Sequence, residues 1–231
     1  MGICVVIPAY NCEKTIESVV RETLQQGFPL LVVDDGSIDQ TAEQIAGLPV
    51  NLIRHDVNKG KGMALRTAFD WALMNGFSMV VTLDADGQHD PTAICAMVAE
   101  ARGKGFDLLL ASRYSQFQEM AGLRRYWNRF GAWCMRKRTG FKIDDSQSGF
   151  RVYSSKLLRS VNLVSTGYDL EMEILVKCWK AGFSIGSVPV AARVADGRST
   201  SHFRPVRDTW RICMTFLKFS IPCESPNAAK P

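Results

Sequence analysis

Short runs of apolar residues alternate along the first half of the chain with longer segments in which apolar residues recur every three or four positions. The short runs are rich in Val, Ile and Leu, which is typical of strands buried on both faces of a sheet. The longer segments have the period of amphipathic helices. We expect strands at 3–7, 30–33, 50–53, 79–83 and 106–111, and helices at 11–27, 39–46, 63–75 and 91–104. This alternation predicts an α/β fold, Rossmann-like, in which helices flank a mostly parallel sheet.

Polar residues and glycines mark the ends of these helices. A short polar side chain before a helix can accept a hydrogen bond from its first free N–H groups, and glycine adopts the left-handed conformation that ends many helices. The expected N-caps are Asn11, Asp39, Asp90 and Asp169, and the expected ends are Gly27 and Gly182. Pro91, directly after Asp90, suits the first helical position.

The second half of the chain is less regular. We expect a helix at 118–138, a strand at 148–153, a helix at 169–180, a strand at 183–190 and an apolar helix at 208–220. No internal repeat or linker interrupts the pattern, so the prediction is one domain over residues 1–222. We expect residues 223–231 to form a disordered tail.

The stretch 79–91 carries the strongest chemical signal. A strand of the buried type ends in an acidic loop with Asp84, Asp86 and Gln88. Hard divalent cations take oxygen ligands, and Mg²⁺ commonly takes one or two carboxylates together with substrate phosphates. The alternative is a polar loop with a helix cap. That alternative suits Asp90 but not Asp84 and Asp86, because an acidic cluster beside a buried strand repels itself unless a positive charge is close.

Polar clusters follow four of the expected strands. They are Tyr10–Asn11, Asp34–Asp35, Asp84–Asp86 and Ser112–Arg113. In a parallel sheet the carboxyl ends of the strands share one edge, and ligands bind outside that edge. Four separate segments therefore converge on one predicted site.

Composition narrows the class of protein. The chain has 231 residues, of which 46% are hydrophobic and 22% charged, and these are ordinary values for a globular protein. Its seven cysteines are scattered without a CxxC motif, which argues against a disulfide framework or a zinc site and favours a reducing compartment. No signal peptide is visible, and no window reaches the roughly 20 apolar residues of a membrane span. We therefore expect a cytoplasmic protein.

The net charge of +5 is unevenly distributed. Residues 113–142 hold eight basic residues against one acidic residue, Glu119. Polybasic segments bind anionic membrane surfaces, and the helix at 208–220 could lie in the same interface. Alternatively, this helix packs on the domain and the basic residues surround a phosphate site. The partners that we weigh are the cytoplasmic face of a membrane or a membrane protein, and we expect no nucleic acid.

Eight motifs follow one another along the chain. They are IPAYN at 7–11, VDDGSIDQT at 33–41, NKGKGMAL at 58–65, LDADGQHDP at 83–91, SR at 112–113, DSQSGFRVY at 145–153, GYDLEMEIL at 167–175 and SHFRPVRD at 201–208. With these motifs the chain resembles the family 2 glycosyltransferases. It is most similar to their dolichyl-phosphate mannose synthase and polyprenyl-phosphate sugar transferase branch, over residues 3–208.

The resemblance implies the nucleotide-diphospho-sugar transferase (GT-A) fold. It implies a nucleotide-binding half at about 1–112 and an acceptor half at about 113–222. The donor would be a nucleotide-diphospho-sugar, either a GDP-sugar or a UDP-sugar.

The resemblance also implies which residues hold the donor. The residues implied to hold the nucleoside are Pro8, Tyr10, Glu13 and Asp35. Tyr10 would pack on the base and Asp35 would accept a hydrogen bond from it, whereas Asp34 would brace the turn. Lys59 and Lys61 lie in a glycine-bounded loop before a helix, which suits a pyrophosphate.

The implied reaction breaks an anomeric C–O bond, and the departing diphosphate needs positive charge around it. Mg²⁺ or Mn²⁺, coordinated by Asp84, Asp86 and Gln88, would supply part of that charge. The other candidates to bind phosphates are Arg113, Arg151, Arg198, Arg204, Ser148 and Ser199. We expect His89 and His202 to be surface residues.

The acceptor decides whether the reaction needs a base. A polyprenyl phosphate is already an anion and needs only cations, whereas a hydroxyl on a glycan or lipid must lose a proton. Glu171, in the acidic group of Asp169, Glu171 and Glu173, is the candidate to contact the sugar or to act as that base. A single displacement would invert the anomeric configuration with either acceptor.

Two alternatives of other classes are weaker. A phosphorylatable receiver domain also places paired aspartates at strand ends, but it needs a lysine where Ser112–Arg113 stand and is usually about half this length. A nucleotide-sugar binding module without catalysis would have lost residues that this chain retains.

Overall fold

The structure is a computed structural model of the chain. It describes residues 2–112, 136–137, 140, 145–191, 193 and 204–220. Several predictions fall outside these ranges. They are nearly all of the helix at 118–138, the tail at 223–231, and the residues Arg113, Arg198, Ser199 and His202.

The described residues build a seven-stranded sheet, in which one strand is antiparallel to its neighbours. The strands are β1 (Ile3–Ala9), β2 (Leu30–Asp34), β3 (Asn51–Arg54), β4 (Met79–Thr82), β5 (Leu108–Ser112), β6 (Arg151–Ser154) and β7 (Ile185–Pro189). Their order across the sheet is β3-β2-β1-β4-β6-β5-β7, and only β6 runs against its neighbours. The prediction of a mostly parallel sheet flanked by helices is confirmed.

Helices connect the strands, as the apolar period predicts. They are α1 (Ile16–Leu24), α2 (Thr41–Gln44), α3 (Lys61–Met74), the 3₁₀ turn η1 (Pro91–Ala93) with α4 (Ile94–Lys104), α6 (Ser155–Ser160), α7 (Leu170–Lys180) and α8 (Pro205–Ser220). The sequence analysis missed α6, which is too short to show a period. It begins at Ser154, whose hydroxyl accepts a hydrogen bond from the Leu157 N–H at 3.1 Å.

Successive residues of the central strands enter two different cores. On β1, Cys4 and Val6 face the core formed with α3, α6 and α7. Val5 and Ile7 face the opposite core, formed with α1 and α4. Both faces of the sheet are therefore covered, which explains why the strands read as unbroken apolar runs.

Of the four expected N-caps, only Asp90 both occupies the cap position and binds the first turn with its side chain. Its carboxylate accepts a hydrogen bond from the Thr92 N–H of η1 at 3.0 Å. Asp39 accepts one from the Thr41 N–H at 3.0 Å, but the cap position of α2 is held by Gln40. Asn11 was wrongly predicted as a cap, since it has a φ of 46° and its side chain accepts from the Ile38 N–H. Asp169 does occupy the N-cap position of α7, as predicted, but its carboxylate binds side chains of α8 instead of an N–H of the first turn.

The reversed direction of β6 shapes the functional edge of the sheet. Because β6 is antiparallel, the segment before it reaches the same edge as the carboxyl ends of β1, β2 and β4. The Thr82 hydroxyl donates to the Gly149 carbonyl at 2.7 Å, and the Ala111 N–H donates to the Phe150 carbonyl at 3.0 Å. Residues 145–150 are thereby fixed beside the acidic loop that follows β4.

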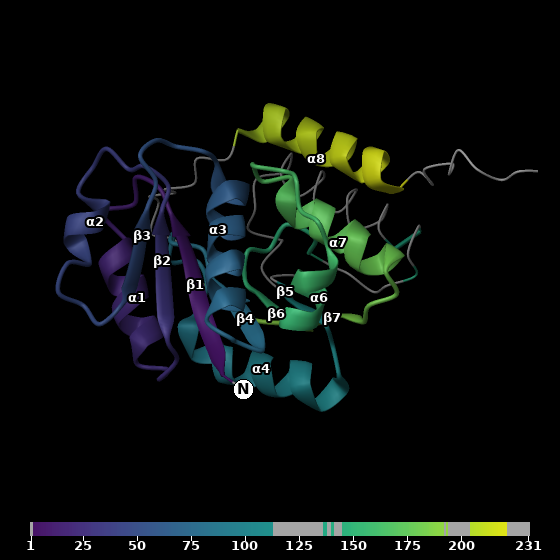
Figure 1. Ribbon diagram of the computed structural model, residues 1–231, viewed down its shortest axis with the longest axis horizontal. Coiled ribbons are helices and arrows are strands. Elements are labelled where there is room, and N and C mark those ends of the chain that lie inside the picture. Colours follow the sequence, from purple (N-terminus) through teal and green to yellow (C-terminus); the bar gives the residue numbers. More distant parts are fainter. Residues whose placement is uncertain are drawn as a thin grey trace, which may run out of the picture.

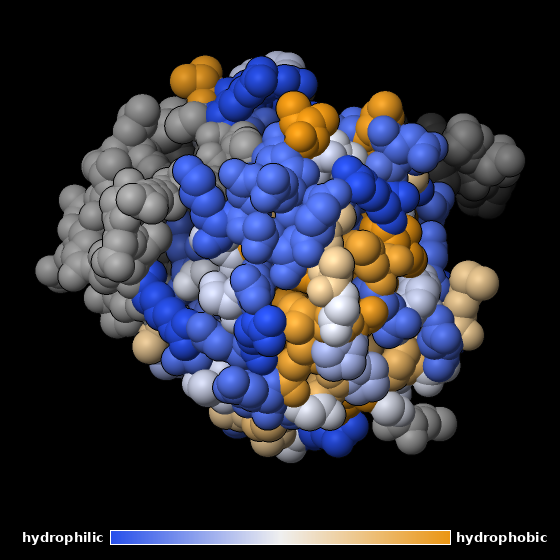
Figure 2. Space-filling view, turned by 90° about the vertical axis from the view of Figure 1, so that its left-hand side faces the viewer, coloured by the Kyte–Doolittle hydropathy of each residue, from blue (hydrophilic) through white to orange (hydrophobic). Residues whose placement is uncertain are grey.

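Helix α8 packs on α7 at the upper side of the molecule (Figure 1). Figure 1 shows β1 rising from the N-terminus toward the upper side of the molecule, where α8 extends above α3 and α7. The face in Figure 2 is predominantly hydrophilic in its upper part apart from separate hydrophobic residues along the top, and further hydrophobic residues reach the surface lower down. None of the helices in the described ranges combines the length and hydropathy that crossing a bilayer requires.

Candidate active site

Hydrogen bonds join the loop after β1 to the loop after β2. The Asn11 N–H donates to the Ser37 hydroxyl at 2.9 Å, and the Cys12 N–H donates to the Thr41 hydroxyl at 2.8 Å. The Glu13 carboxylate accepts from the Gln40 N–H at 3.2 Å. Two predicted nucleoside-binding segments are therefore one rigid unit, and its Pro8, Tyr10 and Glu13 are half-buried.

Asp34 braces its own turn. Its carboxylate is fully buried and accepts from the Ser37 N–H at 2.9 Å. The Arg54 guanidinium lies 3.2 Å from its second oxygen and also donates to the Ser37 carbonyl. The structure thus gives Asp34 the bracing role that the sequence analysis assigned to it.

Asp35 is more enclosed than a residue expected to bind a nucleobase. Its Oδ1 contacts His55 Nδ1 at 2.7 Å and accepts from the Lys59 N–H at 3.0 Å, while its Oδ2 accepts from the Gly60 N–H at 2.7 Å. A carboxylate has about four acceptor positions, so at most one remains for a base. Asp35 therefore positions the loop at 58–60. The sequence analysis missed His55. The only indication of it in the sequence is a lone histidine directly after an expected strand.

Lys61 joins two carboxylates that are far apart in the sequence. Its Nζ lies 2.7 Å from Asp84 Oδ1 and 3.0 Å from Glu171 Oε1. Burial alone would lower the pKa of Lys61, but the charges of Asp84 and Glu171 raise it above its ordinary value. Lys61 was predicted to meet a pyrophosphate; in this structure its ammonium neutralises two acids.

Tyr168 completes the surroundings of this ammonium. The Lys61 Nζ lies 5.4 Å from the centre of its ring, within the range of a cation–π contact. Burial raises the pKa of Tyr168 to about 12, so its phenol stays protonated at neutral pH.

Asp84 sits against a glycine for which no other residue can substitute without movement. A Cβ at Gly149 would overlap both oxygens and the carboxyl carbon of Asp84. Gly149 is also held in place, because its carbonyl accepts from the Thr82 hydroxyl. This close approach of backbone to carboxylate forms a cradle for Asp84. The sequence analysis did not single out Gly149, although it lies within the motif at 145–153.

The acidic loop can contribute to a metal site but cannot complete one. Asp84 and Asp86 are half-buried and follow one strand, and Asp86 Oδ1 accepts from the Gln88 N–H at 3.0 Å. Within the described ranges, no three His, Cys, Asp or Glu side chains are placed to bind one metal ion together. Two carboxylates are nonetheless what Mg²⁺ takes when donor phosphates supply further oxygens. The cradle and this pair of acids therefore fit a divalent cation that binds together with a phosphorylated ligand.

Arg151 and Ser148 do not reach the site as predicted. Arg151 is fully buried, and its guanidinium donates to three backbone carbonyls, those of Ser146, Ser148 and Glu171, at 2.7–2.9 Å. Ser148 is fully buried as well. We correct both assignments: Arg151 positions the loop at 145–150 and the first turn of α7, and neither side chain is placed to contact a leaving group.

The remaining predicted residues are spread over the same edge. Lys59 is exposed in the loop at 58–60, and Arg204 is exposed just before α8. His89 was wrongly expected at the surface, since it is buried with its ring against Phe150. The structure therefore brings together Asp35, Lys61, Asp84 and Glu171, and it leaves Arg204 outside this group.

The sequence of the chain also matches the model of a known protein family. The model described as Glycosyl transferase family 2 matches residues 4–162. The chain belongs to glycosyl transferase family 2. It is accordingly an enzyme of sugar transfer, as the motifs implied.

Relatives of this glycosyltransferase are similar over most of its length. It is 30% identical over 211 residues to a UDP-N-acetylglucosamine–dolichyl-phosphate N-acetylglucosaminyltransferase of Methanococcus voltae, and the match covers 81% of this chain and 84% of the relative. It is 30% identical over 205 residues to the polyprenol monophosphomannose synthase of Mycolicibacterium smegmatis, covering 80% of this chain and 75% of the relative. Resemblance to the polyprenyl-phosphate branch of the family is therefore confirmed.

Solved structures confirm the fold class. A glucosyl-3-phosphoglycerate synthase from Mycobacterium tuberculosis, crystallised with Mn²⁺ and UDP-glucose, superposes with a TM-score of 0.73. The two chains are 23% identical, and the match covers 98% of this chain and 80% of the other. The predicted nucleotide-diphospho-sugar transferase (GT-A) fold is correct.

The cradle at Gly149 makes a first prediction. In Gly149→Ala, the new methyl group must displace the Asp84 carboxylate, so we expect binding of UDP or GDP with Mn²⁺ to weaken about tenfold or more, because a misplaced ligand carboxylate binds the metal poorly. Calorimetric titration measures this, and the Tm should change little. Gly103→Ala on α4, where the methyl group meets nothing within 4 Å, is the matched control. Unchanged nucleotide affinity in Gly149→Ala would contradict the role of the cradle.

The buried guanidinium makes a second prediction. Arg151→Met takes a hydrogen-bond donor away from three buried carbonyls, so we expect the free energy of unfolding to fall by roughly 3 kcal/mol. Urea denaturation measures this loss. Arg159→Met, on the exposed surface of α6, should change stability by less than about 0.5 kcal/mol. If Arg151→Met kept its full stability and lost only activity, the earlier assignment as a leaving-group cation would be restored.

Proposed function

We propose that this enzyme transfers a sugar from a nucleotide-diphospho-sugar to a polyprenyl phosphate, with Mg²⁺ or Mn²⁺ as cofactor and with inversion at the anomeric carbon. The observation that carries the proposal is the pair Asp84 and Asp86 at the end of β4, beside Lys61 and the joined loops of β1 and β2. The names of the M. voltae and M. smegmatis relatives support the lipid-phosphate acceptor. The M. tuberculosis structure with Mn²⁺ and UDP-glucose supports the donor and the metal.

The donor would lie along the carboxyl edge of the sheet. Pro8, Tyr10 and Glu13 would border the nucleoside, with Asp35 holding the loop beneath it. Lys59, exposed in that loop, would attract the diphosphate. When bound, the metal would be held by Asp84 and Asp86, with Gln88 as a further oxygen ligand, and would neutralise the charge of the leaving diphosphate.

The chemistry is a single displacement. An oxygen of the acceptor phosphate forms the new bond to the anomeric carbon. The bond to the diphosphate breaks, and its electron pair leaves with the nucleoside diphosphate. Attack on the face opposite the leaving group inverts the anomeric configuration, and no proton need be removed from an acceptor that arrives as an anion.

The position of Glu171 favours this acceptor over a hydroxyl. Glu171 is the candidate base, yet its carboxylate lies 3.0 Å from the Lys61 ammonium and is nearly buried. To take a proton it would have to give up the Lys61 ammonium as its partner, whereas an ionised phosphate needs no base. Glu171 would instead act on the donor side, through Lys61.

The proposed function makes a third prediction. Purified enzyme with Mn²⁺ should release UDP from a UDP-sugar, or GDP from a GDP-sugar, only when a short polyprenyl phosphate is added. Asp86→Asn should lower this rate about a hundredfold or more while the fold remains stable, because it removes one charge from the metal site. Asp70→Asn, an exposed carboxylate on α3, is the control. Release that does not respond to the lipid phosphate but rises with a glycan would favour the hydroxyl acceptor.

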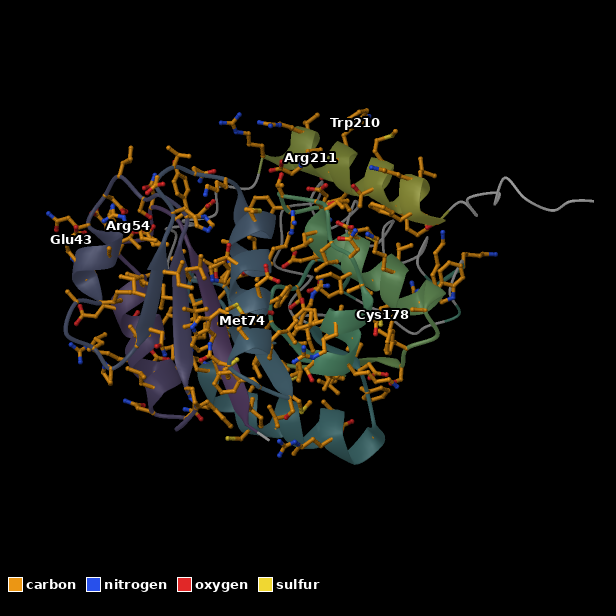
Figure 3. All side chains as sticks on the ribbon, in the orientation of Figure 1. Glu43, Arg54, Met74, Cys178, Trp210 and Arg211 are labelled. Atoms are coloured by element: carbon orange, nitrogen blue, oxygen red, sulfur yellow. The ribbon has the colours of Figure 1, made fainter. Side chains whose placement is uncertain are left out.

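A lipid acceptor requires the enzyme to reach a membrane surface, and α8 offers the means. Four of its large apolar side chains are exposed along one side: Val206, Trp210, Met214 and Leu217. They recur at the helical period, and basic residues flank them at Arg204, Arg207 and Lys218. Figure 3 shows Trp210 on the side of α8 that points away from the rest of the chain. We assign this stripe to an anionic bilayer surface, since both its apolar side chains and its positive charge suit one.

The stripe makes a fourth prediction. The double variant Trp210→Asp, Leu217→Asp should bind vesicles containing anionic phospholipid at least about tenfold more weakly than the wild type, because each change removes an apolar side chain worth about 1.5–3 kcal/mol when buried. Sedimentation with vesicles measures this. Met74→Asp is the control, because Met74 is 87% exposed at the far end of α3 (Figure 3). Equal binding by the double variant would contradict the assignment.

A further inference from the structure

The backbone around Lys61 is fixed from two directions. The Gly60 N–H is bound by Asp35, and the Met63 N–H donates to the Thr166 carbonyl at 3.1 Å. Gly60 and Gly62 approach the backbone at Thr166 so closely that a Cβ at either position would overlap it. Lys61 therefore cannot leave the site by movement of its loop, and only its side chain is able to rearrange.

The side chain of Lys61 occupies the place where a cation is needed most. Its ammonium is 2.7 Å from the Asp84 oxygen that was predicted to bind the metal, and the side chains of both residues are largely shielded from water. An ion pair in such surroundings is stronger than one at the surface. A divalent cation must compete with Lys61 for Asp84.

We propose that Lys61 is a resident counter-ion of the metal site, which divalent metal and donor displace together. This inference rests on the proposed function. Metal alone would bring two positive charges to a carboxylate that Lys61 already neutralises. The donor diphosphate adds negative charge and offers the ammonium a new partner, so the cost of breaking the Lys61–Asp84 pair falls when both ligands bind. Glu171 Oε1, 3.0 Å from the Lys61 Nζ, keeps the ammonium beside the diphosphate after Asp84 has been released.

The proposal implies a coupling between two ligands. If Lys61 opposes metal in the absence of nucleotide, then nucleotide must tighten metal binding, and metal must tighten nucleotide binding by the same factor. The coupling makes the enzyme bind metal effectively only in the presence of its donor. Lys61 is thus a positioning residue for the metal and donor, distinct from the ligands of the metal itself.

The test is a titration with Mn²⁺ followed by electron paramagnetic resonance, which detects free Mn²⁺, in the absence and presence of UDP or GDP. In Lys61→Met we expect Mn²⁺ alone to bind about five- to tenfold more tightly than in the wild type, because the competing charge is gone. The factor by which nucleotide tightens Mn²⁺ binding should fall correspondingly. Lys61→Gln, which keeps the polar character of the side chain, should behave in the same way.

Lys104→Met is the control. It removes the same charge, but Lys104 is exposed at the C-terminal end of α4, so its loss should leave the affinity for Mn²⁺ alone within about twofold of the wild type. Unchanged or weaker binding of Mn²⁺ alone by both Lys61 variants would overturn the proposal while leaving the proposed function intact. A wild-type enzyme that bound no Mn²⁺ even with UDP or GDP would overturn both.

Discussion

The buried guanidinium of Arg151 is the interaction on which the rest of the site depends. A charged group without exposed surface is tolerated only when hydrogen bonds replace its water. Here three carbonyls do so, and they belong to the loop at 145–150 and to the first turn of α7. Arg151 thereby determines where Gly149 meets Asp84 and where Glu171 meets Lys61. The catalytic edge is assembled around a residue that does not itself reach it.

The parts of this arrangement that depend on local pattern could be predicted from the sequence. Apolar periodicity located the strands and most helices, because both faces of the sheet are buried. The acidic loop after β4 could be recognised because two carboxylates beside a buried strand repel each other unless a positive charge is close. Convergence of the strand ends follows from parallel topology alone, so Asp35 and Asp84 were expected at one edge before their contacts were known.

What could not be predicted was decided by competition between partners. Asn11 and Asp169 have the residue types of N-caps, but the Ile38 N–H in one case and Arg211 and Thr215 of α8 in the other bind their side chains instead. Arg151 was predicted to bind a phosphate because the sequence does not show that its guanidinium is buried. The antiparallel direction of β6 brings Gly149 to the site. It cannot be recognised from the sequence of a strand of only four residues. Each of these outcomes depends on contacts between residues far apart in the chain.

The balance of charge explains why position 61 suits a lysine. Asp84, Asp86 and Glu171 bring three carboxylates to a site that, under the proposed function, also receives an anionic donor. A cation is therefore needed between them both before and after the donor binds. Arginine would bind Asp84 through a planar two-pronged contact that is difficult to displace, whereas the lysine ammonium is a point charge on a flexible stem and exchanges partners readily. The tight contacts of Gly60 and Gly62 hold the backbone of Lys61 in place. The exchange of partners is therefore confined to its side chain, which moves between neighbouring oxygens.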